Sequence, residues 1–227
     1  MGLIINLDTA TDTASVCITD NGRSIFTIKN ENQKEHASFI HTGIKTALEE
    51  VDLEISNIDA FAVTAGPGSY TGLRVGMATA KGFCYALSKP LITVSTLEAM
   101  AIAAIIATDA EDILYCPMID ARRMEVFTAV YDNELKKILA PTALVLEEGS
   151  FNNFTTLGKI MFFGTGSLKY ATIEKKANAF FNTIDFSAEH VGIVAEKAFK
   201  QQDFSNLSVA EPAYLKEFYS ATKQINM

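Results

Sequence analysis

The sequence predicts an α/β protein of two lobes, in which the second lobe is a degenerate repeat of the first. Three short apolar segments with a hairpin signal open the chain, and helical and strand patterns then alternate up to about residue 108. A second strand-like segment that ends in aspartate follows at 113–119, as the first segment does at 3–7. With 48% hydrophobic and 20% charged residues, the chain of 227 residues can bury a sizeable core.

The first three elements are predicted to be consecutive antiparallel strands. Leu7 is followed by Asp8-Thr9, which ends the first apolar run, and Asn21-Gly22 is a strong hairpin-turn signal between the second and third runs. The predicted strands are 3–7, 14–19 and 24–29.

Helix and strand alternate after the third strand. Gly66-Pro67-Gly68 breaks the chain, and Ser69 or Thr71 can cap the helix that follows. Ser95 and Glu98 match a capping box that opens a third helix. The predicted helices are 36–51, 69–87 and 95–108, and the strands between them are 58–64 and 91–94. This β-β-β-α-β-α-β-α order is that of a lobe of actin, hexokinase or Hsp70.

The second half begins like the first but becomes irregular. Asp120 ends the strand 113–119, as Asp8 ends the first strand, and a hairpin partner is predicted at 124–131. A strand at 160–163 and a helix at 188–200 follow. The predicted domains are an N-terminal lobe, 1–108, and a degenerate C-terminal lobe, 109–227.

Composition excludes several classes of function. The net charge of −8 and the lack of a basic run argue against direct tRNA binding by this chain alone. Cys17, Cys84 and Cys116 form no CxxC pair, which is typical of a reducing cytoplasm. The N-terminus lacks the basic region of a signal peptide, and the longest helical apolar stretch, 100–107, is too short to span a bilayer. We therefore expect a cytoplasmic protein without membrane contact.

Specific motifs identify a family. The segment 66–76, GPGSYTGLRVG, closely resembles the motif of the TsaB (YeaZ-like) family, and Asp8-Thr9, the segment 120–127 (DARRMEVF) and the segment 211–215 (EPAYL) also match. Lys216 stands where that family usually has arginine. The resemblance is strong over residues 1–130, patchy to 200, and returns in the tail.

The resemblance implies an ASKHA (actin/hexokinase/Hsp70-like) fold and a non-catalytic scaffold subunit. It implies pairing with a catalytic paralogue, TsaD, and with the ATPase TsaE, in a complex that transfers threonylcarbamoyl to the adenosine next to the anticodon of tRNAs reading codons that begin with A. The chain would meet tRNA only through the complex and would form a homodimer when alone. The alternative is an ATP-dependent kinase or acyltransferase of the same superfamily, which needs acidic magnesium ligands in both lobes and a glycine-rich adenosine loop.

The partner surface is predicted on the first two helices. Gly72, Gly76 and Ala80 recur every four residues and so share one helix face, where small side chains allow close approach of another backbone. Spacing alone leaves two interpretations, packing inside this chain or against a partner, and the resemblance favours the partner. The predicted interface residues are Ile40, Ile44, Leu48, Tyr70, Gly72, Arg74, Gly76, Thr79, Ala80 and Phe83.

No metal site is predicted. The catalytic paralogue carries two histidines four residues apart, whereas His36 and His41 are five apart, which rotates the second ring about 140° around a helix. Solvent exposure or capping is the expected role of both histidines.

Nucleotide contact has weaker support. Asp8, Thr9 and Thr11 form a strand turn that faces phosphates in active members of the superfamily, or an ordinary turn that satisfies its own backbone. The resemblance also allows ATP or ADP at a subunit interface. Arg122 and Arg123 could hold an anion or pair with Asp120 or Glu125, and we expect a structural role with partner contact. The sequence contains no HExxH, GxSxG or Walker A lysine motif, so hydrolysis is not predicted.

Overall fold

The first sheet is built by five strands from the N-terminal half of the chain. The computed structural model describes residues 2–32, 35–110 and 112–216. Strands β1, β2 and β3 are antiparallel neighbours, whereas β4 and β5 add to β1 in parallel, so the order is β3-β2-β1-β4-β5. The bounds are β1 (Leu3–Asp8), β2 (Ala14–Asp20), β3 (Arg23–Asn30), β4 (Ala60–Gly66) and β5 (Leu91–Ser95), as predicted to within two residues.

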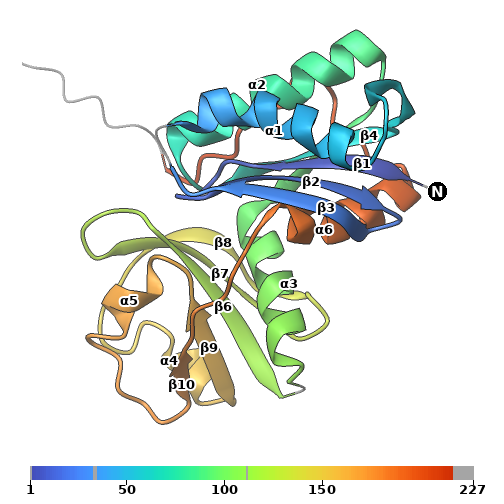
Figure 1. Cartoon of the computed structure of the whole chain (residues 1–227). Coiled ribbons are helices and arrows are strands. Elements are labelled where there is room, and N and C mark those ends of the chain that lie inside the picture. The colour runs from blue at the N-terminus through green and yellow to red at the C-terminus, as the bar shows by residue number, and fades with distance from the viewer. Residues whose placement is uncertain (1, 33–34, 111, 217–227) are drawn as a thin grey trace, which may run out of the picture.

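Helices cover both faces of this sheet. α1 (His36–Glu50) and α2 (Tyr70–Leu87) lie on one face, and α3 (Thr96–Thr108) and α6 (Ala188–Gln201) lie on the other (Figure 1). A short 3-10 turn, η2 (Ile55–Asn57), precedes β4. Apolar side chains from α1, α2 and the sheet form one core, while α3 and α6 close a second core on the opposite face.

The second sheet repeats the strand order of the first. Its order is β8-β7-β6-β9-β10, with antiparallel pairs β6–β7 and β7–β8 and parallel pairs β6–β9 and β9–β10. The predicted internal duplication is therefore confirmed at the level of topology. The bounds are β6 (Ile113–Asp120), β7 (Glu125–Tyr131), β8 (Lys137–Val145), β9 (Lys159–Phe163) and β10 (Ala179–Phe181).

The second lobe is degenerate because its crossover helices have shrunk. α4 (Asn152–Thr155) and α5 (Ser167–Tyr170) have four residues each, whereas α1 and α2, at the equivalent places in the first lobe, have 15 and 18. A cluster of aromatic rings fills the space on this side of the sheet instead, with Phe151 and Phe162 packed edge-on against Tyr170.

The predicted domain boundary at 108/109 needs correction, because the chain returns to the first lobe near its end. Val191 and Ala195 of α6 are buried against Ile4 and Ile92 of the first sheet, and Ala188 N–H donates to Ser15 Oγ at 2.8 Å. α3 is shared, since Leu97 and Met100 pack into the core of the second sheet. Lobe 1 thus comprises residues 2–110 and 187–216, and lobe 2 comprises residues 112–186.

The segment 203–216, here called the C-terminal strap, runs beside α2 from its end to its beginning. Ser205 N–H donates to Leu91 O at 2.8 Å and so covers the edge strand β5, and Lys81 Nζ of α2 donates to Ala210 O at 2.9 Å. Farther on, Ala213 N–H donates to Ala65 O at 2.6 Å. The strap then reaches lobe 2, where Lys216 Nζ pairs with Glu125 Oε2.

Of two helix caps predicted from the sequence, one is present in the structure and one is not. Ser69 caps α2, because its Oγ accepts from Gly72 N–H at 3.3 Å, as predicted. Ser95 precedes α3, but its Oγ makes no capping bond, so the capping box was wrong.

Candidate functional site

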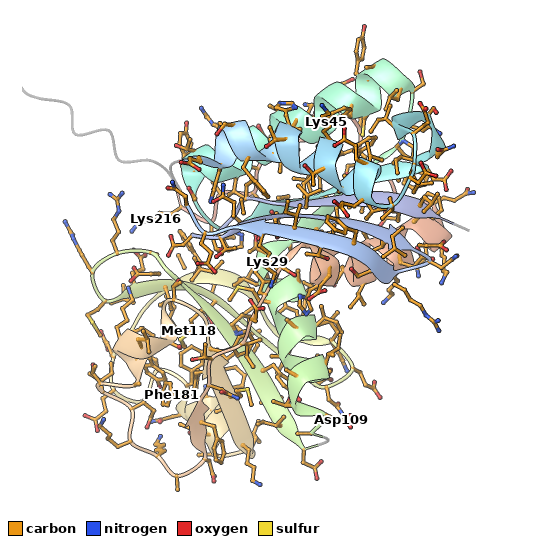
Figure 2. All side chains as sticks on the ribbon, in the orientation of Figure 1. Lys29, Lys45, Asp109, Met118, Phe181 and Lys216 are labelled. Atoms are coloured by element: carbon orange, nitrogen blue, oxygen red, sulfur yellow. The ribbon has the colours of Figure 1, made fainter. Side chains whose placement is uncertain are left out.

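A cleft of about 1530 Å³ separates the two lobes at the ends of β1 and β6. Lobe 1 contributes residues 10–12 and the glycine turn 67–71, lobe 2 contributes residues 119–125, and residues 213–216 of the strap close one side. Lys216, labelled in Figure 2, lies where the two lobes approach each other. The cleft is thus formed by the two corresponding turns of the duplicated fold.

Asp8 lies buried at the end of β1, at the base of this region. Its Oδ1 accepts from Thr64 Oγ1 at 2.8 Å and from Ala10 N–H at 3.1 Å, whereas Oδ2 has no hydrogen-bond partner among the described residues. Burial, which penalises the charged carboxylate, raises the pKa of Asp8 to about 6 despite these two bonds. The carboxyl group therefore stays largely protonated below that pH.

The glycine turn is pressed against the turn that follows β1. Thr9 Oγ1 donates to Gly72 O at 2.7 Å, and Ser69 N–H donates to Ala10 O at 2.7 Å. A side chain at Gly68 would overlap Ala10, so glycine is required there for close approach of the two backbones. Thr9 is buried in this contact, and of the three predicted turn residues only Thr11 lines the cleft.

The acids of the lobe 2 turn are neutralised by lysines. Lys169 Nζ lies 2.9 Å from Asp120 Oδ1, and Lys216 pairs with Glu125. Although partial burial alone would raise the pKa of Asp120, the hydrogen bonds from Lys169 and from the Arg122 N–H lower it. The alternative that arginine pairs with Asp120 or Glu125 was wrong.

Arg122 and Arg123 occupy the tip of the β6–β7 turn. Both have positive φ, 70° and 49°, a conformation that costs a non-glycine residue roughly 1 kcal/mol or more. Both side chains are exposed, and neither makes an ion pair within the part of the chain that the structure describes.

A magnesium nucleotide does not fit these residues. Asp120 already holds Lys169, Oδ1 of Asp8 already accepts from Thr64 and the Ala10 N–H, and the Ser69 N–H is used by Ala10. The glycine-containing turn between β9 and α5, Gly164-Thr165-Gly166, could also cradle a phosphate by its composition, but Gly166 N–H already donates to Met118 O at 2.9 Å. Within residues 2–32, 35–110 and 112–216, no group of three or more His, Cys, Asp or Glu side chains could hold a metal ion.

The histidines have separate roles. His36 is buried at the start of α1, where its Nε2 lies 3.1 Å from Asp12 O, so exposure was the wrong expectation for this residue. His41 is exposed beside the ring of Phe83 at 6.2 Å. The three cysteines are free and buried, as expected for small core side chains.

Most of the predicted partner-surface residues face the inside of lobe 1. Ile40 and Ala80 are completely buried, Ile44 is 2% exposed, and Thr79 is 8% exposed. A Cβ at Gly76 would lie 2.5 Å from Thr9 Oγ1 and 3.2 Å from Val63 Cγ2, and one at Gly72 would overlap Thr9 O. The row 72, 76 and 80 therefore packs against this chain's own β1 turn and β4, and placing it at a partner was wrong.

Four of the ten predicted residues remain accessible in part. Tyr70 and Arg74 are exposed at the beginning of α2, whereas Leu48 and Phe83 are half-buried against the lobe 1 core. Phe83 stacks on Phe61 with ring centroids 5.2 Å apart, which limits it to a mainly internal role.

A second row of small residues faces outward along α2. It contains Ala78, Gly82 and Ala86, with the larger Arg74 one turn before them, again four residues apart and all exposed. A Cβ at Gly82 would meet nothing within 4 Å, so nothing in the described part of this chain requires glycine there. On α1 the exposed neighbours are also mostly small or polar, namely Ala37, Ser38, His41, Thr42 and Lys45. We call these exposed residues of both helices the α1–α2 face.

Comparisons with solved structures first define the class of protein. An inorganic polyphosphate/ATP-glucomannokinase from Arthrobacter sp. strain KM covers 89% of this chain and 100% of its own with a TM-score of 0.52 at 11% identity, which establishes only the ASKHA fold. A Pseudomonas aeruginosa protein described as similar to peptidase YeaZ aligns with a TM-score of 0.84 and 26% identity, over 95% of this chain and 100% of that one.

Sequence comparisons then give the family. The family model "TsaD: tRNA N6-adenosine threonylcarbamoyltransferase" matches residues 27–226. The Haemophilus influenzae tRNA threonylcarbamoyladenosine biosynthesis protein TsaB is 36% identical over 124 residues, which are 55% of this chain and 51% of that protein. The chain belongs to this TsaD-type family, in its TsaB (YeaZ-like) branch. It matches about half the length of the curated TsaB relatives. None of the described helices is long and apolar enough to cross a membrane.

Proposed function

We propose that this chain is a non-catalytic subunit of a system that forms threonylcarbamoyladenosine in tRNA. In this proposal it pairs with a TsaD-like catalytic paralogue through the α1–α2 face and acts together with a TsaE-like ATPase. The names of its relatives and of the matching family model support the pathway. Two observations support the absence of catalysis: Asp120 at the cleft is held by Lys169, and the described residues contain no group of three or more His, Cys, Asp or Glu side chains that could hold a metal ion.

The outward row on α2 carries the assignment of the pairing surface. Gly82 stands in the interior of an 18-residue helix, where glycine costs about 1 kcal/mol relative to alanine, and a Cβ there would meet no neighbouring element among the described residues. Small residues spaced by four allow the backbone of another helix to approach closely. The same face would pair two copies of this chain when the paralogue is absent. tRNA would be contacted through the complex, and a nucleotide at the subunit interface also belongs to the proposal.

A matched pair of substitutions tests the pairing surface. Gly82→Leu adds bulk on the outward row, so it should weaken association with the TsaD-like paralogue by roughly 5- to 150-fold while the melting temperature of the isolated chain is kept or raised. Gly76→Leu on the inward row should instead destabilise the isolated chain, because its Cβ would displace Thr9. Calorimetric titration and thermal melts at low protein concentration measure both effects.

Two results would contradict the proposed function. One is the absence of any association between the unchanged chain and the paralogue from the same cell. The other is transfer of threonylcarbamoyl to tRNA, or hydrolysis of ATP, by this chain alone above a buffer control.

A further inference from the structure

Arg74 is held in one orientation at the beginning of the outward row on α2. Its guanidinium carbon lies 4.0 Å from the centre of the Tyr70 ring, and its Nε donates to Tyr214 Oη at 3.1 Å. Tyr70 and Tyr214 also contact each other, with ring centroids 5.4 Å apart. The two tyrosines come from α2 and from the C-terminal strap, 144 residues apart in the chain, and together they fix the plane of the guanidinium.

Among the described residues, the outer edge of this guanidinium meets no acceptor. Arginine has five N–H donors, and the Nε–H of Arg74 is the one that meets an acceptor among the described residues. The four N–H groups of Nη1 and Nη2 form a planar fork that matches a carboxylate with two parallel hydrogen bonds. Since the ring of Tyr70 and the Tyr214 hydroxyl already restrict the side chain, less rotamer entropy remains to be lost on binding.

The position of Arg74 identifies what the fork would meet. Arg74 precedes Ala78 and Gly82 on the same exposed row, so a helix packed along that row passes its guanidinium. The lysines of the two helices are engaged, because Lys81 of α2 donates to Ala210 O and Lys45 of α1 lies 3.7 Å from Glu49, so Arg74 is the cation that the α1–α2 face itself offers. A single positive charge matches a single carboxylate better than a phosphate, which proteins usually hold with several donors.

We propose that Arg74, oriented by Tyr70 and Tyr214, is the anchor for one carboxylate of the partner subunit at the end of the α1–α2 face. The proposal rests on the proposed function and adds a specificity-determining contact to it. It also gives the C-terminal strap a part in recognition, since Tyr214 supports the anchor from behind.

Three substitutions separate the parts of the anchor. Arg74→Ala should weaken association with the TsaD-like paralogue by about 10- to 100-fold, and the weakening should shrink at high salt. Arg74→Lys keeps the charge but loses the planar fork, so most of the loss should persist. Tyr214→Phe removes only the hydroxyl that orients Nε, and we expect a loss of roughly 3- to 10-fold. Arg23→Ala, an exposed arginine at the β2–β3 turn, is the control and should bind as the unchanged chain does.

The partner carboxylate can be located by a double-mutant cycle. Acidic residues of the paralogue are replaced by alanine one at a time, and one replacement should weaken binding to the unchanged chain yet have little further effect on Arg74→Ala. Failure of the unchanged chain to bind at all would refute the proposed function itself. Binding of Arg74→Ala that equals binding of Arg23→Ala would refute the anchor alone.

A phosphate group bound by Arg74 in place of a partner carboxylate would give a different pattern. Titrations are repeated with inorganic phosphate and with ADP in excess. If either competes with the partner for the unchanged chain but not for Arg74→Ala, and no partner acid couples to Arg74, the anchor is a phosphate site and the carboxylate proposal is overturned.

Discussion

Asp8 is a carboxyl group whose charged form the surrounding protein disfavours. Its side chain is 1% exposed and its Oδ1 accepts two hydrogen bonds, yet Oδ2 meets no donor among the described residues. The folded pKa of about 6 exceeds the ordinary value of 3.8. Between these two pH values the folded chain keeps a proton that the unfolded chain has released. The free energy of unfolding due to Asp8 therefore falls as pH rises through this window.

Asp8→Asn should remove this pH dependence. Relative to the unchanged chain, the variant should gain up to about 3 kcal/mol of stability between about pH 4 and about pH 7.5, because only the unchanged chain incurs the cost of ionisation. The amide keeps an oxygen for Thr64 and the Ala10 N–H, so its packing changes little. Denaturant titrations of both chains at the two pH values measure the difference. A constant difference between the two chains at both pH values would mean that Asp8 titrates normally.

The strap shows how a segment without regular structure protects an element. Its bridge to Leu91 covers the edge strand β5, which would otherwise expose unpaired backbone groups. Ser205 makes two bonds to that strand, one from its N–H to Leu91 O and one between its hydroxyl and that of Thr93, both at 2.8 Å.

Ser205→Pro removes both bonds and should lower the free energy of unfolding by about 2–4 kcal/mol. Ser205→Ala keeps the N–H and should lower it by only about 0.5–1.5 kcal/mol. Urea denaturation followed by circular dichroism compares the two variants with the unchanged chain. Equal losses in the two variants would show that the backbone bond to Leu91 contributes nothing.

Helix α2 shows what the sequence could and could not predict at this scale. Its existence, its start at the glycine turn and its Ser69 cap follow from local chemistry, and all three were predicted. Local chemistry does not determine which face of α2 turns toward the sheet, because the rows 72-76-80 and 78-82-86 both consist of small residues spaced by four. Only the position of Thr9 and Val63 beneath Gly76 decides which row faces inward. That position depends on contacts more than 60 residues apart in the chain.

Lobe 2 was harder to predict because its elements have weak local sequence patterns. Strand β8 alternates poorly, with pattern-breaking Pro141, and α4 and α5 are too short for a helical period to show. The duplication was predicted from Asp8 and Asp120 and from the two following hairpins. The return of α6 to lobe 1 was missed because its apolar row, including Val191 and Ala195, fits either sheet equally well as a pattern.

At the scale of the molecule, the corrected lobe boundary predicts which pieces can fold. A chain that stops at residue 108 leaves Ile4, Ala62 and Ile92 without the cover of α6 and should not unfold cooperatively. The same chain joined through a flexible linker to residues 186–216 should regain a cooperative transition, although below that of the full chain because α3 has lost lobe 2. Thermal melts followed by circular dichroism compare the two. A cooperative melt of the shorter piece at the temperature of the full chain would contradict the assignment of α6.

Residues 188–201 complete a sheet whose five strands are all made before residue 96. During synthesis the ribosome must add roughly 80 residues after α3 before α6 emerges, which takes about 4–16 s at usual translation rates. For that time the apolar part of the first sheet that α6 covers, including Ile4 and Ile92, stays exposed while lobe 2 is still being made. The nascent chain therefore presents a transient site for chaperones, and a stalled or slowly decoded stretch within lobe 2 would prolong the exposure of lobe 1 as well.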